Sequence, residues 1–459
     1  MLIMRALRGA MCAVSIAAAC SAAQIAPVLA APVLAAPHGE RIAESPAKKT
    51  VVNYAVRRGE NLYTLARHYL MRPSDYRTVQ LLNKIADPRR IPVGTWLRIP
   101  FALLKTEPLT ARLVAVRGSV RLRRGAQDIV PQVGAPVEQG SVLETGADGF
   151  VAITLPNGSR TSLPTRTSLR IDHLRRVLLT NSIDYDFTVA GGKAEIKAAP
   201  LGENANNRFR IRTPRAIAAV RGTQFRVGFT DEISLAEVLE GTVAASADEN
   251  AAPTDLSQGF GAVITSAGTI TPEALLPAPD LLSPGKVQVD PLVRLAAAPL
   301  AGARGYHLQI AQDSSFAAVL AEASNDTGQF AFADIPNGGL FVRISAAASS
   351  GLEGMAQTFA MRRVLAGLAA SASMDADTLR FAWGGQGEGS RIYHFQLGPN
   401  APDGPLMIDE AGLTDESLAL RHLPPGVYRW RVGLRQTTGE GTIENWLPFE
   451  KLTVAPQER

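Results

Sequence analysis

Short runs in which apolar and polar residues alternate occupy most of this 459-residue chain. Val151, Ile153 and Leu155 alternate in this way and lead into Pro156-Asn157-Gly158-Ser159, which favours a tight turn between two strands. Alternation with a period of two is typical of strands that bury one face. Helical spacing stands out near residues 61–82 and is nearly absent between residues 112 and 267. The pattern therefore predicts a mainly β, multidomain protein with one small helical part.

The helical part lies inside a strand–helix–helix–strand pattern over residues 53–101. Tyr54 and Val56 alternate with their neighbours and predict a short first strand. Asn61 is a preferred helix N-cap, and apolar residues recur at helical spacing behind it. These residues are Leu62, Leu65, Ala66 and Tyr69. The first half of the pattern therefore predicts one strand and one short helix.

A second helix is expected to start at Pro73-Ser74-Asp75, because Ser and Asp accept hydrogen bonds from free backbone N–H groups. Its predicted apolar face consists of Val79, Leu81 and Leu82, and it ends near Asn83. The last strand is predicted from Trp96, Leu97 and Ile99. Together these elements make one small βααβ unit.

This βααβ unit resembles a LysM module, and the likeness covers residues 51–103. It rests on the Tyr-x-Val-x-x-Gly opening, the Leu-x-x-Leu-Ala of the first helix, Asn83, and the Ile-Pro-x-Gly-x-x-Leu-x-Ile-Pro finish. Many such modules have Asp-Thr after the glycine, where this chain has Glu60-Asn61. The resemblance implies binding of glycans that contain N-acetylglucosamine, such as peptidoglycan. The implied binding residues are Gly59, Glu60, Asn61, Leu62, Ile85, Ile91, Pro92 and Val93.

Residues 110–267 read as an all-β unit of short strands. Val114, Val116, Val120 and Leu122 alternate around Gly118, and similar runs follow. The motifs in this unit are similar to those of a FecR domain. They are Gly118-x-Val, Gly140-x-x-Leu-x-Thr-Gly146, Leu155-Pro-Asn-Gly-Ser159, Thr213-Pro214, Arg221-Gly-Thr-x-Phe225 and Leu239-Glu-Gly-x-Val243. The resemblance implies a β domain that contacts another envelope component.

The C-terminal third contains an internal repeat with a period of about 87 residues, roughly one β-sandwich domain. Gly305-Tyr-His-Leu-Gln-Ile aligns with Ile392-Tyr-His-Phe-Gln-Leu, and Glu353-Gly354 aligns with Glu440-Gly441. Both copies, residues 285–363 and 370–456, resemble fibronectin type III or related immunoglobulin-like modules. Trp383 fills the early-strand position where such modules commonly carry tryptophan, whereas the first copy has Ala297. The first core is therefore expected to pack differently.

The N-terminus predicts export. Residues 1–23 look like a secretory signal, and residues 24–50 form an Ala/Pro-rich linker. Both cysteines, Cys12 and Cys20, fall inside the signal, so no disulfide is expected; lipidation of Cys20 stays an alternative. No other stretch is apolar for long enough to be a transmembrane helix. The predicted location is the periplasm or cell envelope, in association with peptidoglycan.

Composition and motifs argue against nucleic-acid binding and catalysis. The net charge of +5 is small for this length, and the arginines are dispersed along predicted strands, where solvated faces are expected. No histidine pair has metal-ligand spacing, and Asp172-His173 and Asp184-Tyr-Asp186 read as polar loop or strand-edge residues. No enzyme activity, catalytic residue, metal site or cofactor is therefore predicted.

These features together predict a non-catalytic envelope protein. The LysM-like module would anchor it to peptidoglycan, and the FecR-like and sandwich domains would offer surfaces to an envelope protein whose identity the sequence does not give. The alternative is a FecR-type sensor or regulator that receives a signal in the envelope.

Overall fold

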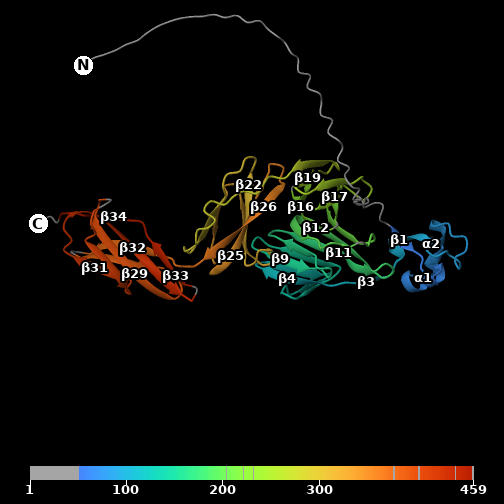
Figure 1. The fold of residues 1–459 in the computed structure, drawn as a ribbon, viewed down its shortest axis with the longest axis horizontal. Coiled ribbons are helices and arrows are strands. Elements are labelled where there is room, and N and C mark those ends of the chain that lie inside the picture. The colour runs from blue at the N-terminus through green and yellow to red at the C-terminus, as the bar shows by residue number, and fades with distance from the viewer. Residues whose placement is uncertain are drawn as a thin grey trace, which may run out of the picture. The chain divides into compact units, whose positions relative to one another are not determined.

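The computed structural model describes residues 51–456 except 203, 221, 231, 376–377, 402–403 and 440. Strands dominate these residues, and helices occur only near the start, so the prediction of a mainly β multidomain chain is confirmed (Figure 1). The predicted signal and linker, residues 1–50, lie outside the described residues. Among the described helices, none has the length and apolar character needed to cross a bilayer.

The first module is the expected βααβ unit. Strand β1 pairs antiparallel with β2 so that Tyr54 lies opposite Leu97, and the helices pack beside this pair. The elements are β1 (Val51–Ala55), α1 (Leu62–Tyr69), the 3-10 turn η2 (Pro73–Asp75), α2 (Tyr76–Leu82) and β2 (Trp96–Pro100), followed by the 3-10 turn η3 (Phe101–Leu103). The short strands and helices share one core, to which Val177 and Leu179 from the next domain also belong.

The predicted apolar face of the second helix is wrong in part. Val79 is buried, but Leu81 is 79% exposed and Leu82 is 40% exposed. Each residue turns an α-helix by about 100°, so Leu81 lies about 200° around the axis from Val79 and points to solvent. Helix α2 has only seven residues and contacts the core through little more than one turn.

The central unit is a closed barrel of antiparallel neighbours with one parallel pair, β12–β13. Its strands are β3 (Thr106–Pro108), β4 (Ala111–Arg117), β5 (Val120–Arg124), β6 (Gln127–Ile129), β7 (Pro136–Val137), β8 (Ser141–Thr145), β9 (Phe150–Thr154), β10 (Arg160–Leu163), β11 (Ser168–Val177), β12 (Ser182–Lys197), β13 (Arg208–Thr213), β14 (Ala216–Val220), β15 (Gln224–Thr230), β16 (Ile233–Glu240), β17 (Thr242–Ser246), β18 (Thr254–Ser257), β19 (Phe260–Ile264) and β20 (Ile270–Ala274).

Strand β12 links the two parts of this barrel because it bends in its middle. Its first half pairs with β13, and its second half pairs with β15. Gly192 stands at the bend with φ of +77°, and a Cβ there would lie 2.4 Å from the carbonyl oxygen of Arg166. Only glycine therefore fits this position without a shift of the backbone.

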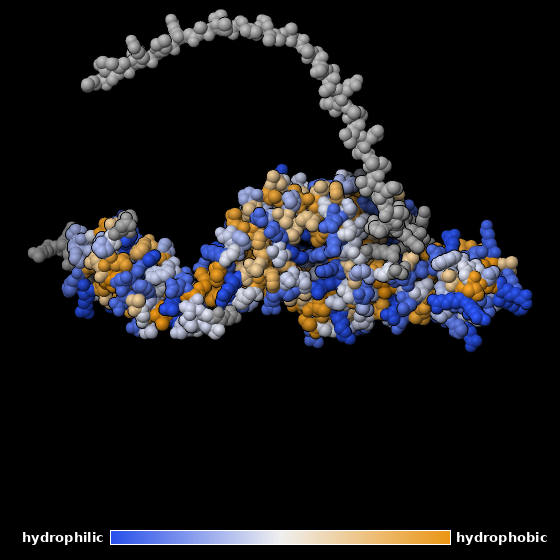
Figure 2. Space-filling view, viewed as in Figure 1, coloured by the Kyte–Doolittle hydropathy of each residue, from blue (hydrophilic) through white to orange (hydrophobic). Residues whose placement is uncertain are grey.

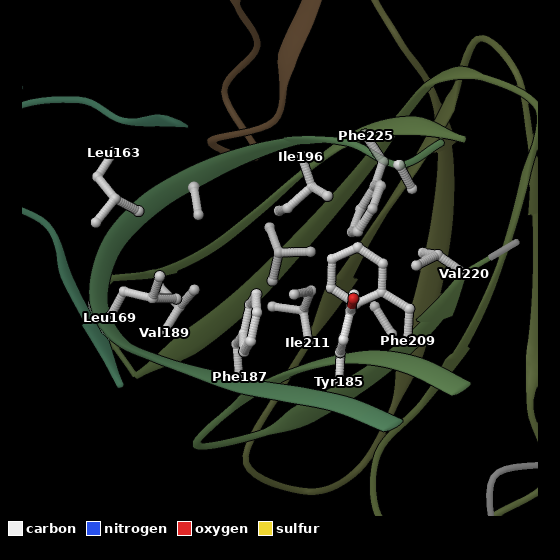
Figure 3. Packing of buried hydrophobic residues seen from close by; sticks show 14 of the residues in the cluster. Leu163, Leu169, Tyr185, Phe187, Val189, Ile196, Phe209, Ile211, Val220 and Phe225 are labelled. Atoms are coloured by element: carbon white, nitrogen blue, oxygen red, sulfur yellow. The ribbon is translucent and has the colours of Figure 1, made fainter. Parts of the chain in front are cut away.

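Large apolar side chains fill the barrel interior. Tyr185 and Phe187 stand two residues apart on β12, and the ring of Phe209 on β13 meets each of them edge-on at 5.6 Å. Leucine, isoleucine and valine side chains from the surrounding strands complete this cluster (Figure 3).

The alternation predicted around Gly118 is shifted by one residue in β4. Leu113 is buried in the barrel core, whereas Val114 is 37% exposed. The pairing of β4 with β9 changes register between Leu113 and Ala115, which is a β-bulge. A bulge inserts one residue and reverses which side chains face inward, so a strict period of two fails there.

Each C-terminal repeat is a sandwich of two sheets around one core. The first contains β21 (Val293–Ala296), β22 (Gly305–Ala311), β23 (Val319–Asn325), β24 (Gln329–Phe332), β25 (Gly338–Ala347) and β26 (Glu353–Arg363). The second contains β27 (Ala369–Asp375), β28 (Thr378–Gly384), β29 (Ser390–Pro399), β30 (Ile408–Leu413), β31 (Ser417–Arg421), β32 (Gly426–Thr438), β33 (Gly441–Trp446) and β34 (Glu450–Val454). The larger sheet of the first sandwich has the strand order β23-β22-β25-β26, and β24 pairs with β21 in the other sheet.

Candidate functional site

The loop that enters helix α1 is closed by a capping box. The Asn61 side chain accepts a hydrogen bond from the Thr64 N–H at 2.9 Å, and the Thr64 hydroxyl accepts one from the Asn61 N–H at 3.0 Å. The predicted N-cap role of Asn61 is therefore confirmed. The two side chains thus satisfy two backbone donors reciprocally, one each.

The neighbouring Glu60 carboxylate is used inside the same loop. It accepts a hydrogen bond from the Tyr54 hydroxyl at 2.8 Å and one from the Arg57 N–H at 2.8 Å. Burial and this hydrogen bond raise the pKa of Tyr54 above its ordinary value. Gly59 sits at the tip with φ of +85°. Glu60 thus holds the shape of the loop around an exposed glycine.

Backbone hydrogen bonds join this loop to the loop before β2. The Leu62 N–H donates to the Pro88 carbonyl at 3.0 Å, and the Gly94 N–H donates to the Val56 carbonyl at 2.8 Å. The structure therefore brings together the two loops that the sequence analysis selected.

The eight predicted glycan-binding residues differ in accessibility. Val93 is 66% exposed, whereas Leu62 and Ile91 are buried at 2% and 9%. A ligand would meet the backbone of these two residues rather than their side chains. Gly59, Pro92 and Val93 are exposed, and Glu60, Asn61 and Ile85 are half-buried. Ligand binding by these residues stays a prediction.

Other polar and aromatic groups of the module were not predicted as site residues. Trp96 is 69% exposed, although it pairs with Ala55 in the ladder. The rings of Tyr63 and Tyr76 lie 4.5 Å apart near the start of α1. Hydrophilic and apolar residues are interspersed over this module in the space-filling view (Figure 2). Solvent-facing rings suit stacking on the apolar faces of sugars or on other rings.

A second polar site lies where the barrel meets the first sandwich. We call it the interface ion cluster and define it as Lys193, Arg226, Glu237, His307 and Glu353. Arg226 donates to Glu237 at 2.6 Å and to Glu353 at 3.0 Å. Lys193 lies 3.0 Å from Glu237 and 3.1 Å from Glu353. His307 lies 3.2 Å from Glu353.

The electrostatics of the cluster favour the charged forms. Burial alone would lower the pKa of His307, but Glu353 and Glu322 outweigh it and raise that pKa to about 9. Burial would raise the pKa of the Glu353 carboxyl, but Arg226, Lys193 and His307 hold it well below its usual range. Because each charge has a partner, the cluster joins the two domains without leaving an isolated buried charge.

An apolar contact accompanies the interface ion cluster. Phe150 and Ala152 of the barrel are buried in one cluster with Phe316 and Val319 of the first sandwich. Sequence reasoning gave no sign of this interface, because the outward faces of the strands supply both the charged and the apolar groups.

Two sequence interpretations of charged residues are corrected by the structure. Asp184 and Asp186 are not at a strand edge but are buried within β12, at 0% and 2% exposure. Asp184 pairs with Arg175 at 2.7 Å, and Asp186 pairs with Arg212 at 2.9 Å. Arg226 is likewise buried and does not lie on a solvated face. Opposite charges from neighbouring strands compensate one another, so these positions tolerate burial.

Comparison with known proteins identifies two segments of the chain. Residues 54–100 match the LysM domain, and residues 141–244 match the FecR protein. A search of curated proteins finds no match. The chain therefore contains a LysM segment, which indicates glycan binding, and a FecR segment, which indicates a role in envelope signalling or protein contact. Both families are non-catalytic binding or signalling domains.

Several solved structures share local similarity with the chain. An anti-sigma factor candidate from Parabacteroides distasonis is 20% identical over 29% of this chain and 59% of its own, with a TM-score of 0.24. A two-domain fibronectin type III segment of chicken tenascin is 14% identical over 39% of this chain and 100% of its own, with a TM-score of 0.18. The FN1–FN3 domains of chicken CNTN1 are 13% identical over 53% and 95%, with a TM-score of 0.20.

No group of three or more His, Cys, Asp or Glu residues that could hold a metal ion occurs among the described residues. Arg221, which opens the most specific FecR motif, lies outside them.

Proposed function

We propose that this protein is a non-catalytic component of the cell envelope that binds peptidoglycan through its LysM segment. The glycan, which contains N-acetylglucosamine, lies between the Gly59–Leu62 loop and the loop that carries Ile91, Pro92 and Val93. The periplasm is the proposed location. The FecR-like barrel and the sandwiches then present surfaces to an envelope protein partner.

The observation that carries this proposal is the pairing of the two loops. Hydrogen bonds fix each loop internally and link Leu62 to Pro88 and Gly94 to Val56, so the two loops are held next to each other before a ligand arrives. Preorganisation of this kind lowers the entropy cost of binding. The exposed apolar side chain of Val93 suits contact with the apolar parts of an N-acetylated sugar.

Co-sedimentation of the full chain with purified peptidoglycan sacculi tests the proposal. Deleting the LysM segment is a poor test, because Val177 and Leu179 pack against its core and would be exposed. The better variant is Val93→Asp, which places a charge on the loop that would contact the glycan. Val133→Asp is the matched control, because Val133 in the barrel is also 66% exposed. Loss of sedimentation for Val93→Asp alone is expected; equal sedimentation of both variants would contradict the proposal.

A second candidate function is that of an envelope sensor, which the FecR match at residues 141–244 favours. A sensor must pass its signal to the other side of a membrane. N-terminal sequencing of the protein recovered from the envelope distinguishes the two functions. A retained Met1 favours the sensor, and a chain that begins after the predicted signal favours the wall-bound protein.

A further inference from the structure

A cavity of about 390 Å³ lies beside the interface ion cluster, between the barrel and the first sandwich. The barrel contributes charged and polar side chains from strands β10, β12, β15 and β16, and the sandwich contributes further polar side chains and the apolar side chains of Phe316 and Met355. Cavities at domain interfaces with an apolar wall and a few convergent polar groups are where small ligands bind most often.

At the inner end of the cavity, the charged side chains already pair with one another. Arg343 of the sandwich donates two hydrogen bonds to the Glu195 carboxylate of the barrel, at 3.0 and 2.9 Å. Lys193 and Arg226 share Glu237 and Glu353. These groups hold the cavity walls together and leave no charge there for a ligand to neutralise.

The outer end is different, because four residues form a row across four neighbouring strands. Arg160 on β10 is the ladder partner of Lys197 on β12, and Lys197 is the partner of Gln224 on β15. Gln224 is in turn the partner of Glu240 on β16. Residues directly opposite each other share one face of a sheet, and all four line the cavity. The order of charges along the row is positive, positive, neutral, negative.

The charges at the ends of this row have no counter-ion among the described residues. Arg160 donates to the Ser315 hydroxyl at 3.0 Å, and neither it nor Lys197 is paired with a carboxylate. Glu240 has no basic partner there either. Like charges opposite each other on a ladder are destabilising, so the Arg160–Lys197 pair has a cost that a bound anion would remove.

We propose that this cavity binds a short peptide with free termini. Its carboxylate lies between Arg160 and Lys197, its ammonium group contacts Glu240, and its backbone crosses Gln224. The spacing sets the length: Lys197 and Glu240 are two strand separations apart, or about 10 Å, and an extended chain covers about 3.3 Å per residue. A ligand of about three residues fits this span. The proposal does not rest on glycan binding by the LysM segment.

Isothermal titration calorimetry with the full chain tests this assignment. The probe is the tripeptide Ala-Ala-Ala, compared with its C-terminal amide and its N-acetylated form. The free tripeptide is expected to bind, and each blocked form is expected to bind about tenfold more weakly or not at all, since one lost charge contact is worth about that factor. No binding of the free tripeptide, or equal binding of the amide, would overturn the assignment.

Variants of Lys197 and Glu240, the two rim residues, test whether the tripeptide binds in this cavity or elsewhere on the surface. Lys197→Gln should weaken binding of the free tripeptide about tenfold and leave binding of the C-terminal amide unchanged. Glu240→Gln should also weaken binding of the free tripeptide about tenfold and leave binding of the N-acetylated form unchanged. Arg121→Gln is the control, because Arg121 is an exposed barrel arginine outside this cavity. Both rim residues are exposed, so folding should persist, and the melting temperature of each variant checks this. Unchanged affinity in both rim variants would overturn the proposal.

Discussion

In the first sandwich, His307 and Arg343 lie on the outer face of the β22–β25 pair, where the barrel covers them; in the second sandwich, His394 and Arg431 take the matching positions on β29 and β32. The similarity extends to a cross-strand ladder of four polar residues. The ladder is His307, Gln309, Glu322 and Arg343 in the first copy, and His394, Gln396, Asp409 and Arg431 in the second.

The bonds within the two ladders are alike. Gln309 donates to Glu322 at 3.0 Å and accepts from Arg343 at 2.6 Å. Gln396 donates to Asp409 at 2.9 Å and accepts from Arg431 at 2.8 Å. One pattern of residues therefore builds the same polar surface twice.

The two ladders are covered by different groups. Arg343 reaches Glu195 of the barrel, whereas the Arg431 guanidinium lies over the ring of Trp446 at 4.4 Å. Gly433 permits this second arrangement, because a Cβ there would lie 2.6 Å from the Trp446 ring. The same sheet face is therefore a domain contact in the first sandwich and a surface closed by the sandwich's own aromatic residue in the second.

The two cores also differ. Trp383 is buried in the second core, and Ala297 takes its place in the first. Phe330 and Phe332 on β24 of the first sandwich are buried, where the second has Leu418 and Leu420 on β31. Larger side chains on one strand thus replace the volume that the tryptophan would supply on another.

The largest loss of stability is expected when Glu353 loses its charge, because this carboxylate lies at the centre of the contact between the first sandwich and the barrel. Glu353→Gln leaves Lys193, Arg226 and His307 short of a partner and should cost about 4 kcal/mol of unfolding free energy. Calorimetric unfolding of the full chain measures it. Neutralising a carboxylate of the second ladder by Asp409→Asn should have a far smaller effect, since Asp409 is exposed. Equal losses in the two variants would remove the distinction between a covered and an uncovered ladder.

The stability that His307 of the first ladder contributes should also depend on pH. The pKa of His307 is raised to about 9, so its stabilising contribution is complete below about 6.5 and is lost as pH rises through about 9. The loss is at most roughly 3 kcal/mol. Thermal unfolding between pH 6 and pH 10 measures it. His307→Gln should abolish this part of the pH dependence, while His394→Gln should leave it in place.

A smaller loss of stability is expected from substitutions of aromatic residues in the two sandwich cores. Trp383→Phe removes part of a buried ring and the hydrogen bond from the indole N–H to the Asp415 carbonyl, at 3.0 Å. The expected loss is about 2 kcal/mol. Phe332→Leu in the first sandwich should cost about 1 kcal/mol, because leucine already fills the matching position of the second. Unfolding by denaturant gives both values, and a larger loss for Phe332→Leu would contradict the proposed exchange of volume.

The smallest loss of stability is expected from removing Trp446, the ring that covers Arg431 of the second ladder. Trp446 is 36% exposed, so Trp446→Ala should cost only about 1 kcal/mol. Hydrogen exchange of the β32 amides shows whether the cover protects that strand. A loss as large as that for Glu353→Gln would mean that both ladders are equally important to their domains.

Local patterns in the sequence predicted the parts of the molecule that depend on neighbours in the chain. Asn61 was identified as a helix cap because the cap bonds to Thr64, three residues away. The internal repeat predicted two similar modules in the C-terminal third, and each repeat folds as a sandwich of two sheets. Alternation failed at Val114, because no local signal marks the bulge in β4.

Contacts between distant residues could not be predicted in the same way. Arg226 and Glu353 are 127 residues apart, and each looks like a surface residue within its own strand. The alignment of Glu353 with Glu440 marked the position as part of the repeat but gave no sign of its partners. The two loops that we propose to bind glycan were selected by family resemblance, and the structure shows that Leu62 and Ile91 of that set are buried.

The central claim is that the LysM segment binds an N-acetylglucosamine glycan through the two paired loops. Calorimetric titration of a linear N-acetylglucosamine tetramer into the full chain tests it most directly. Saturable binding is expected for the unaltered protein and for Val133→Asp, with at least a tenfold loss for Val93→Asp. An absence of binding to the unaltered protein, or equal affinity in all three proteins, would contradict the account.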